Sequence, residues 1–201
     1  MTRTDELVEL LRSKGGIAKQ SELRAAGFSA GLIASLTANG TISRETRGVY
    51  ALPDALTDDF ETVTSRWGRA VISHGSALYL HGLTDRFPLV LDVTFPSTYN
   101  ATGFIAACPD AIVHRANADR YSLGIEYIKG MSGAPVRVYD RERCICDALA
   151  ARNKNEMDMQ TFKSALRGYF NSPDKDLPKL TEYAQALGVK KDLQRYAEVM
   201  L

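Results

Sequence analysis

Residues 27–40 read GFSAGLIASLTANG, and this stretch decides the fold of the N-terminal region of the 201-residue chain. Gly27 predicts a tight turn, because glycine readily adopts the left-handed backbone conformation that such turns need. Ser29 predicts the N-cap of a helix, and Asn39-Gly40 predicts the end of that helix. A shorter helix is expected just before the turn, over residues 19–26, with Leu23 facing inward.

The flanking segments complete a winged helix-turn-helix. Upstream, Thr4 is expected to cap a helix over residues 5–14, which Gly15-Gly16 ends. The apolar residues spaced to bury one face of that helix are Leu7, Val8, Leu10 and Leu11. Downstream, two strand-like runs over residues 41–44 and 48–52 enclose the turn Glu45-Thr46-Arg47. Three short helices followed by a hairpin predict a winged module, whose third helix is suited to a DNA major groove.

The candidate DNA contacts are polar or basic side chains on the second helix, the third helix and the wing. They are Lys19, Gln20, Arg24, Ser29, Ser35, Thr37, Asn39, Arg44, Thr46 and Arg47. The third helix has no Lys or Arg, so its hydroxyl and amide groups would touch base edges, while the four cations would attract phosphates. Two alternatives stay open, since each cation is also typical of a solvated surface and winged helices also bind proteins.

Composition limits the possible partners. The net charge is +1, so the chain as a whole is not a nucleic-acid coat. Residues 1–53 carry a net +2 from seven basic and five acidic groups, residues 54–128 a net −4 and residues 129–201 a net +3. No apolar run is long enough to span a bilayer and no secretory signal is evident, which predicts a cytoplasmic protein without a membrane partner. The three cysteines, an odd number, are expected to be buried thiols.

The remainder is expected to form a second domain over residues 60–201, after a winged domain over residues 1–53. Pro53, Asp54, Thr57, Asp58 and Asp59 mark a polar, acidic connector. Helices are expected over 60–67 and 74–80, then strands over 89–95, 111–115, 124–129 and 135–139, then helices over 141–152, 160–169, 177–187 and 190–200. Asp158 is expected to cap the helix over 160–169. The predicted class is therefore α+β: a winged helix-turn-helix, then a small mixed or antiparallel sheet with a C-terminal helical bundle.

Catalytic and metal-binding patterns are weak. His74 and His81 are seven residues apart and could share a helical face, but two histidines do not make a zinc site. Cys144 and Cys146 would point apart on a helix, and His114 is expected to be a structural or surface imidazole. The chain has no glycine-rich phosphate loop. We therefore expect no enzyme activity, no metal and no cofactor; the rival reading is an enzyme or nucleotide binder in which the winged domain is a scaffold.

Residues 140–149 are the most distinctive part of the second domain. Asp140 is expected to cap a helix whose apolar face is built from residues 144, 145, 148 and 149. Arg141 and Arg143 at its start are then ordinary parts of the helix. The alternative is that they form a surface that binds a phosphate-bearing partner or an acidic protein.

Several of these motifs together resemble the AbiEi-type antitoxins of bacterial type IV toxin–antitoxin systems. The motifs are Gly15-Gly16-Ile17, Ala25-Ala26-Gly27-Phe28-Ser29, Arg47-Gly48-Val49-Tyr50, and the stretches 73–83 and 140–149. The resemblance implies a transcriptional autorepressor that binds inverted repeats of double-stranded DNA in its own promoter. It also implies that the second domain counteracts a nucleotidyltransferase toxin without a stable complex, in phage defence by abortive infection. The chain departs from the expected pattern in the third helix, which lacks a basic residue.

Weak charge on the winged domain has a consequence for binding. One module of this kind would bind weakly, so two copies on two half-sites would supply specificity. We therefore expect a protein that is monomeric in solution and cooperative on DNA. The alternative function is a transcriptional regulator whose second domain senses a small ligand or a protein partner.

Overall fold

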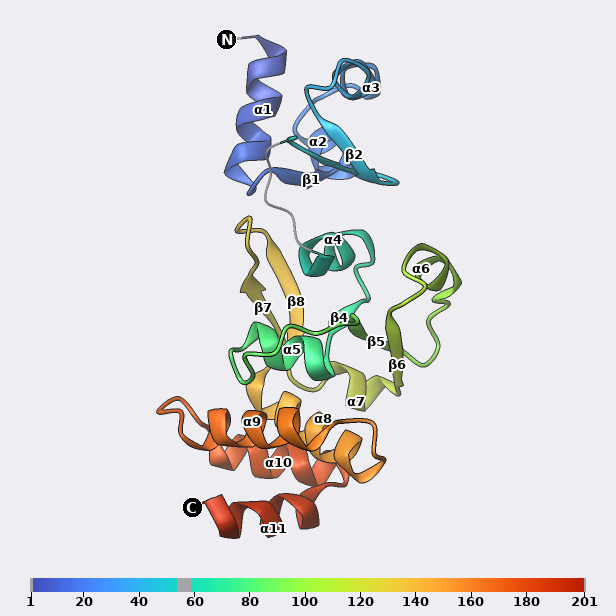
Figure 1. Cartoon of the computed structure of the whole chain (residues 1–201). Helices are drawn as coiled ribbons and strands as arrows, with labels where there is room; N and C mark the ends of the chain where they lie inside the picture. Colours follow the sequence, from blue (N-terminus) through green and yellow to red (C-terminus); the bar gives the residue numbers. More distant parts are fainter. Residues whose placement is uncertain (1, 54–58, 201) are drawn as a thin grey trace. The chain divides into compact units, whose positions relative to one another are not determined.

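The computed structural model describes residues 2–53 and 59–200, and the chain divides into two compact units (Figure 1). Unit 1 comprises Met1–Gly68 and Tyr127–Val136, and unit 2 comprises Arg69–Glu126 and Arg137–Leu201. The predicted connector positions Asp54, Thr57 and Asp58 lie outside the described residues.

Unit 1 begins with three helices and a small sheet, as a winged helix-turn-helix requires. Its elements are α1 (Arg3–Ser13), β1 (Ile17–Lys19), α2 (Gln20–Ala25), α3 (Ala30–Ala38), β2 (Ser43–Thr46), β3 (Val49–Ala51) and α4 (Asp59–Arg66). The strands pair antiparallel in the order β1-β3-β2. Strand β1 is not among the elements expected from the sequence: Ile17 pairs with Ala51 and lies in the sheet.

The start of α1 differs from the prediction. Thr2, not Thr4, is the N-cap, because Asp5 stands three residues later and closes a reciprocal capping box. The Asp5 backbone N–H donates to the Thr2 hydroxyl at 3.2 Å, and the Thr2 N–H donates to Asp5 Oδ2 at 2.7 Å. The bond from the Thr2 backbone N–H, and a smaller contribution from the Thr2 side chain, lower the pKa of Asp5. Capping is thus decided by a pair of residues and not by the threonine alone.

A compact apolar core holds the three N-terminal helices together. Its fully buried members include Leu7, Leu11, Leu23, Ile33 and Ile42. Burying a leucine or isoleucine side chain stabilises a fold by roughly 1.5–3 kcal/mol. The inward facing of Leu7, Leu11 and Leu23 confirms the predicted helical periodicity, and Ile33 anchors α3 with its opposite side toward solvent.

Residues 71–139 contribute a mixed sheet of five short strands. They are β4 (Val71–Ile72), β5 (Asp92–Pro96), β6 (Ile112–Ala116), β7 (Ile125–Lys129) and β8 (Pro135–Tyr139), in the order β6-β5-β4-β8-β7. Strand β4 pairs antiparallel with β5 and parallel with β8, while β5 and β6 are parallel. The central strand β4 was not predicted, since its two residues are too short for a periodic pattern.

Helices flank this sheet, and those at the end of the chain form a separate layer (Figure 1). They are α5 (His74–Leu80), α6 (Thr102–Ala107), α7 (Ala118–Ser122), α8 (Arg141–Asn153), α9 (Met159–Phe170), α10 (Leu177–Leu187) and α11 (Lys190–Met200). Helix α8 packs against α5, α9, α10 and α11. The caps expected at Asp140 and Asp158 are confirmed, as is the α+β class; α6 and α7 were not predicted. None of the described helices is long and apolar enough to cross a membrane.

Candidate nucleic-acid interface

Helix α3 presents a face of small, uncharged side chains. Ala30, Gly31, Ala34, Ser35 and Ala38 are exposed, while Ile33 and Leu36 are buried on the other side. A face of this kind lets the helix backbone come close to a partner surface. Ala methyl groups suit the thymine methyl, and a serine hydroxyl bonds to several base edges.

The polar side chains of α3 differ in how far they are already engaged. The Ser29 hydroxyl accepts a bond from the Leu32 N–H at 3.1 Å, which confirms the predicted cap. Thr37 donates to the Ile33 carbonyl at 2.8 Å, and Asn39 Oδ1 accepts from Thr41 at 3.1 Å. Ser35 is exposed and makes no side-chain hydrogen bond within residues 2–53. Of the four, Ser35 is therefore the one most available to an external partner.

Three arginines of the winged domain are exposed and have no ion pair among the described residues. Arg24 on α2, Arg44 on β2 and Arg47 in the wing turn are exposed, and no acidic partner for any of them lies among the described residues. The cations on α1 and just after it are neutralised, as the pairs Arg3–Glu6 at 3.0 Å, Arg12–Glu9 at 3.2 Å and Lys14–Glu22 at 2.8 Å show. The free positive charge of the winged domain is thus concentrated on α2 and the wing.

Two more predicted contacts lie at the start of α2. Lys19 is its half-buried N-cap residue, and its backbone N–H donates to Glu22 Oε2 at 2.8 Å. The backbone N–H of Gln20, also half-buried, donates to the Gly48 carbonyl at 2.8 Å and so ties α2 to the wing. Partial burial opposes ionisation of Glu22, but its bonds from Lys14 and Lys19 outweigh this and lower its pKa. Lys19 and Gln20 therefore fix the start of α2 beside the wing through their backbone groups.

The wing is a short hairpin with an irregular register. Arg44 stands opposite Tyr50 and Thr46 opposite Val49, so the register shifts between them. Gly48 has φ +80°, a left-handed conformation that favours glycine after Arg47. The side chain of Thr46 lies outside the described part of the chain, so its predicted role stays a prediction.

Arg143, predicted with Arg141 as a partner surface, lies inside unit 2. It is only 4% exposed. Its Nε donates to Asp147 Oδ1 at 2.9 Å, its Nη1 donates to the carbonyls of Arg120 and Leu123, and its guanidinium lies 4.1 Å from the centre of the Tyr139 ring. Burial disfavours its charge, but the Asp147 carboxylate outweighs this and raises the pKa of Arg143. Arg143 therefore braces the fold and is not accessible to a partner.

Arg141 is more accessible, with a quarter of its side chain exposed. Its contact with Asp174 is loose, at 4.0 Å, and its Nε has no hydrogen-bond partner among the described residues. Of the two arginines, only Arg141 is placed where a partner could reach it.

A second polar network, with buried carboxylates and a partly exposed lysine, joins α8 to α10. Lys179 Nζ lies 3.0 Å from Asp140 Oδ2 and 3.1 Å from Glu142 Oε2. Tyr169 donates to Glu142 at 3.0 Å and Tyr183 to Asp140 at 3.2 Å. Burial and the nearby Asp140 carboxylate raise the pKa of Tyr183 to about 12. The carboxylates at the start of α8 are thus engaged inside the domain.

The structure confirms the expected buried thiols for two of the three cysteines. Cys144 and Cys146 are free and fully buried, and burial raises the pKa of both thiols. A buried, protonated thiol is a poor nucleophile and a poor metal ligand. Cys108 is also free but only half-buried.

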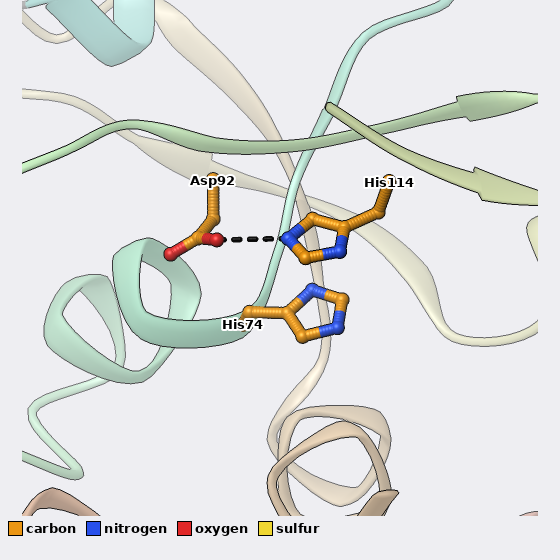
Figure 2. A group of neighbouring side chains, drawn as sticks. All are labelled: His74, Asp92 and His114. Atoms are coloured by element: carbon orange, nitrogen blue, oxygen red, sulfur yellow. Dashed lines mark hydrogen bonds and ion pairs between the residues drawn. The ribbon is translucent and has the colours of Figure 1, made fainter. Parts of the chain in front are cut away.

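Histidines meet in a way that the sequence reasoning missed (Figure 2). His74 does not pair with His81; its ring stacks on that of His114, with 3.6 Å between centroids and 13° between planes. His114 Nε2 lies 2.8 Å from Asp92 Oδ1. His81 lies apart, with Nε2 at 2.7 Å from the Tyr139 carbonyl. Burial lowers the pKa of His74. The pairing of β5 with β6, which brings Asp92 near His114, left no signal in local sequence spacing.

Comparison with known proteins supports the family resemblance of the winged domain. Residues 5–53 match a protein family described as transcriptional regulator, AbiEi antitoxin, which confirms the resemblance over the winged domain and supports a role as antitoxin or regulator. No curated protein sequence matches the chain. Among solved structures, the RV2827C protein from Mycobacterium tuberculosis aligns over 94% of this chain and 78% of that chain, with 13% identity and a TM-score of 0.49.

Proposed function

We propose that this protein is a double-stranded-DNA-binding autorepressor and antitoxin of a type IV toxin–antitoxin operon, acting in the cytoplasm. One observation supports the DNA-binding part: the small, uncharged face of α3 lies in a domain whose exposed arginines Arg24, Arg44 and Arg47 have no acidic partner among the described residues. In this arrangement α3 enters the major groove and the wing contacts the adjacent backbone. The antitoxin family that residues 5–53 match supports the regulatory role.

The chemistry of α3 favours cooperation between two copies. Its Ser35 hydroxyl and Ala methyl groups discriminate bases less sharply than an arginine bidentate to guanine. Three unpaired arginines also give modest counterion release per copy. Two monomers on an inverted repeat add their contacts, so occupancy of the operator becomes cooperative while the free protein stays monomeric.

A binding titration with the duplex from upstream of its own operon tests the proposal. The Arg44→Ala/Arg47→Ala variant should bind more weakly by roughly 1–3 kcal/mol, and the slope of log K against log salt should fall by about two. Arg12→Ala is the matched control, because Arg12 is already paired with Glu9 on α1. Unchanged affinity and salt slope in the double variant would refute the assignment of the wing.

Counteraction of a nucleotidyltransferase toxin is assigned to residues 60–201, without a stable complex. The full-length Arg44→Ala/Arg47→Ala variant separates the two activities, because it retains the whole second domain. It should still rescue cells that express the neighbouring toxin, and the toxin should not co-purify with it. Loss of rescue by this folded variant would show that antitoxicity depends on DNA binding and not on the second domain alone. Arg141→Ala tests whether the accessible arginine of α8 takes part.

A further inference from the structure

Three metal-ligating side chains converge in unit 2 from three different elements. His74 begins α5, Asp92 begins β5 and His114 lies within β6 (Figure 2). One ligand atom from each lies within 4.8 Å of the others. Two imidazoles and one carboxylate form a ligand set that binds Zn²⁺ and related divalent metals.

The strand register explains how Asp92 and His114 meet. His114 pairs with Thr94 across the parallel strands β5 and β6, and Asp92 precedes Thr94 by two residues. Side chains two apart share a face of a strand, so Asp92, Thr94 and His114 all lie on one face of the sheet. Helix α5 then brings His74 over that face, where its ring stacks on His114.

Polar neighbours hold the three groups in place. The Asp92 N–H donates to Ser76 Oγ at 2.9 Å, and Ser73 Oγ lies 3.1 Å from His74 Nδ1. Thr94 in turn donates to Ser73 Oγ at 2.9 Å. Supporting hydrogen bonds of this kind orient the ligands of protein metal sites.

The backbone of α5 adopts an unfavourable conformation to place His74. His74 has φ +45°, a left-handed value that non-glycine residues rarely adopt. The next residue is Gly75, where a Cβ would lie 3.1 Å from Asp92 Oδ2. A strained histidine and a glycine at the point of closest approach together allow the imidazole and the carboxylate to converge.

The cluster is accessible from outside. His114 and Asp92 keep 24% and 13% of their side chains exposed. Two pockets of about 310 and 450 Å³ both have His74, His114 and Glu156 in their walls. The nearby Arg143 does not oppose a cation strongly, because Asp147 neutralises it at 2.9 Å.

We propose that His74, Asp92 and His114 form a binding site for one divalent transition-metal ion, with Zn²⁺ as the best fit. Three protein ligands leave a fourth position open for water or an oxygen ligand. Metal binding requires an unprotonated nitrogen on each imidazole, so a proton on a ligating nitrogen moves to the other ring nitrogen or to solvent when the ion binds. Regulation of the second domain by metal would be independent of DNA contact by α3.

Metal titration of the tag-free, full-length protein after chelator treatment tests this site. Calorimetry with ZnCl₂ should show one ion per chain, and Co²⁺ should give visible absorption without intense sulfur-to-metal bands. Asp92→Asn, which preserves the shape of the side chain, should weaken binding at least about 100-fold, as should His114→Ala. His81→Gln is the matched control, because His81 lies outside the cluster, and it should bind as the natural chain does.

A further variant separates loss of a metal ligand from loss of folding. His74→Gly removes a ligand and also relieves the left-handed backbone, so it should fold and yet fail to bind. Zn²⁺ should raise the melting temperature of the natural chain and of His81→Gln, but not of His74→Gly or Asp92→Asn. Equal affinity in the natural chain and His74→Gly would overturn the proposal. So would intense sulfur-to-cobalt bands that disappear in Cys108→Ser, since they would place the ion on a thiol.

Discussion

Charged side chains are used in opposite ways in the two regions of this protein. In the winged domain, Arg24, Arg44 and Arg47 are exposed and have no acidic partner among the described residues. In unit 2, Arg143 is 4% exposed and bonded to Asp147, and Lys179 bridges Asp140 and Glu142. Unpaired surface cations contribute little to stability but attract polyanions, whereas buried pairs are costly to break.

This difference predicts whether a substitution should change the stability of the protein or its affinity for DNA. Substitutions in the polar network of α8 should change the free energy of unfolding. Substitutions on α3 and the wing should change DNA affinity and leave stability almost intact.

Arg143→Ala should destabilise the protein most, by about 3–5 kcal/mol, because it leaves Asp147 buried without its partner. It also removes the donor to two backbone carbonyls. Urea unfolding followed by circular dichroism measures the change. Arg141→Ala, two residues earlier on α8, is the control and should cost less than about 1 kcal/mol. Equal effects for the two variants would contradict the contrast between buried and accessible arginines.

Lys179→Met should cost about 2–3 kcal/mol at neutral pH, since Asp140 and Glu142 then lie buried without a cation. Burial disfavours the ammonium, but hydrogen bonds to both carboxylates outweigh this and raise the pKa of Lys179. A raised pKa in the folded state means that this stabilisation is complete below pH 10.5, the ordinary value, and is lost only as pH rises through the raised value. Unfolding curves at pH 7 and at increasing pH above 10.5 should show this loss of stability. Lys154→Met, at an exposed lysine, should change little.

Ser35→Glu should weaken DNA binding at least about tenfold, because a carboxylate on the exposed face of α3 would meet phosphates. Stability should stay within about 0.5 kcal/mol, since Ser35 makes no internal bond in the described part of unit 1. A duplex titration beside an unfolding curve measures both. Ser13→Glu adds the same charge on α1 and should bind DNA nearly normally; equal loss in both variants would point to a nonspecific charge effect.

Asp158→Ala should have the smallest effect, about 1 kcal/mol, because it removes the N-cap of α9. Hydrogen bonds from Thr161 and Gln160 lower the pKa of Asp158. A lowered pKa in the folded state means that the stabilisation is present above pH 3.8 and is lost as pH falls through the lowered value. Thermal melts at pH 7 and pH 3 should therefore differ less for the variant than for the natural chain. Asp110→Ala, at an exposed residue without a capping role, should leave this difference unchanged.

Prediction from the sequence succeeded where a few neighbouring residues decide the structure. The Ser29 cap, helices α10 and α11, and the caps at Asp140 and Asp158 all depend on local hydrogen bonds and helical periodicity. The error at Thr2 was also local, and the Asp5 partner could have revealed it. By contrast, β4 has only Val71 and Ile72, and nothing local indicates that it pairs with both β5 and β8.

For the candidate sites, the features decided by local sequence and those decided by long-range packing separate more clearly. Local sequence patterns alone placed Arg44 and Arg47 in a wing and Ser35 on the helix before it, because turn glycines and caps act over a few residues. Burial of Arg143 and the meeting of His74 with Asp92 and His114 depended on packing between elements far apart in the chain. Strand pairing and helix packing create those neighbourhoods, and their energies come from long-range contacts that no short pattern records.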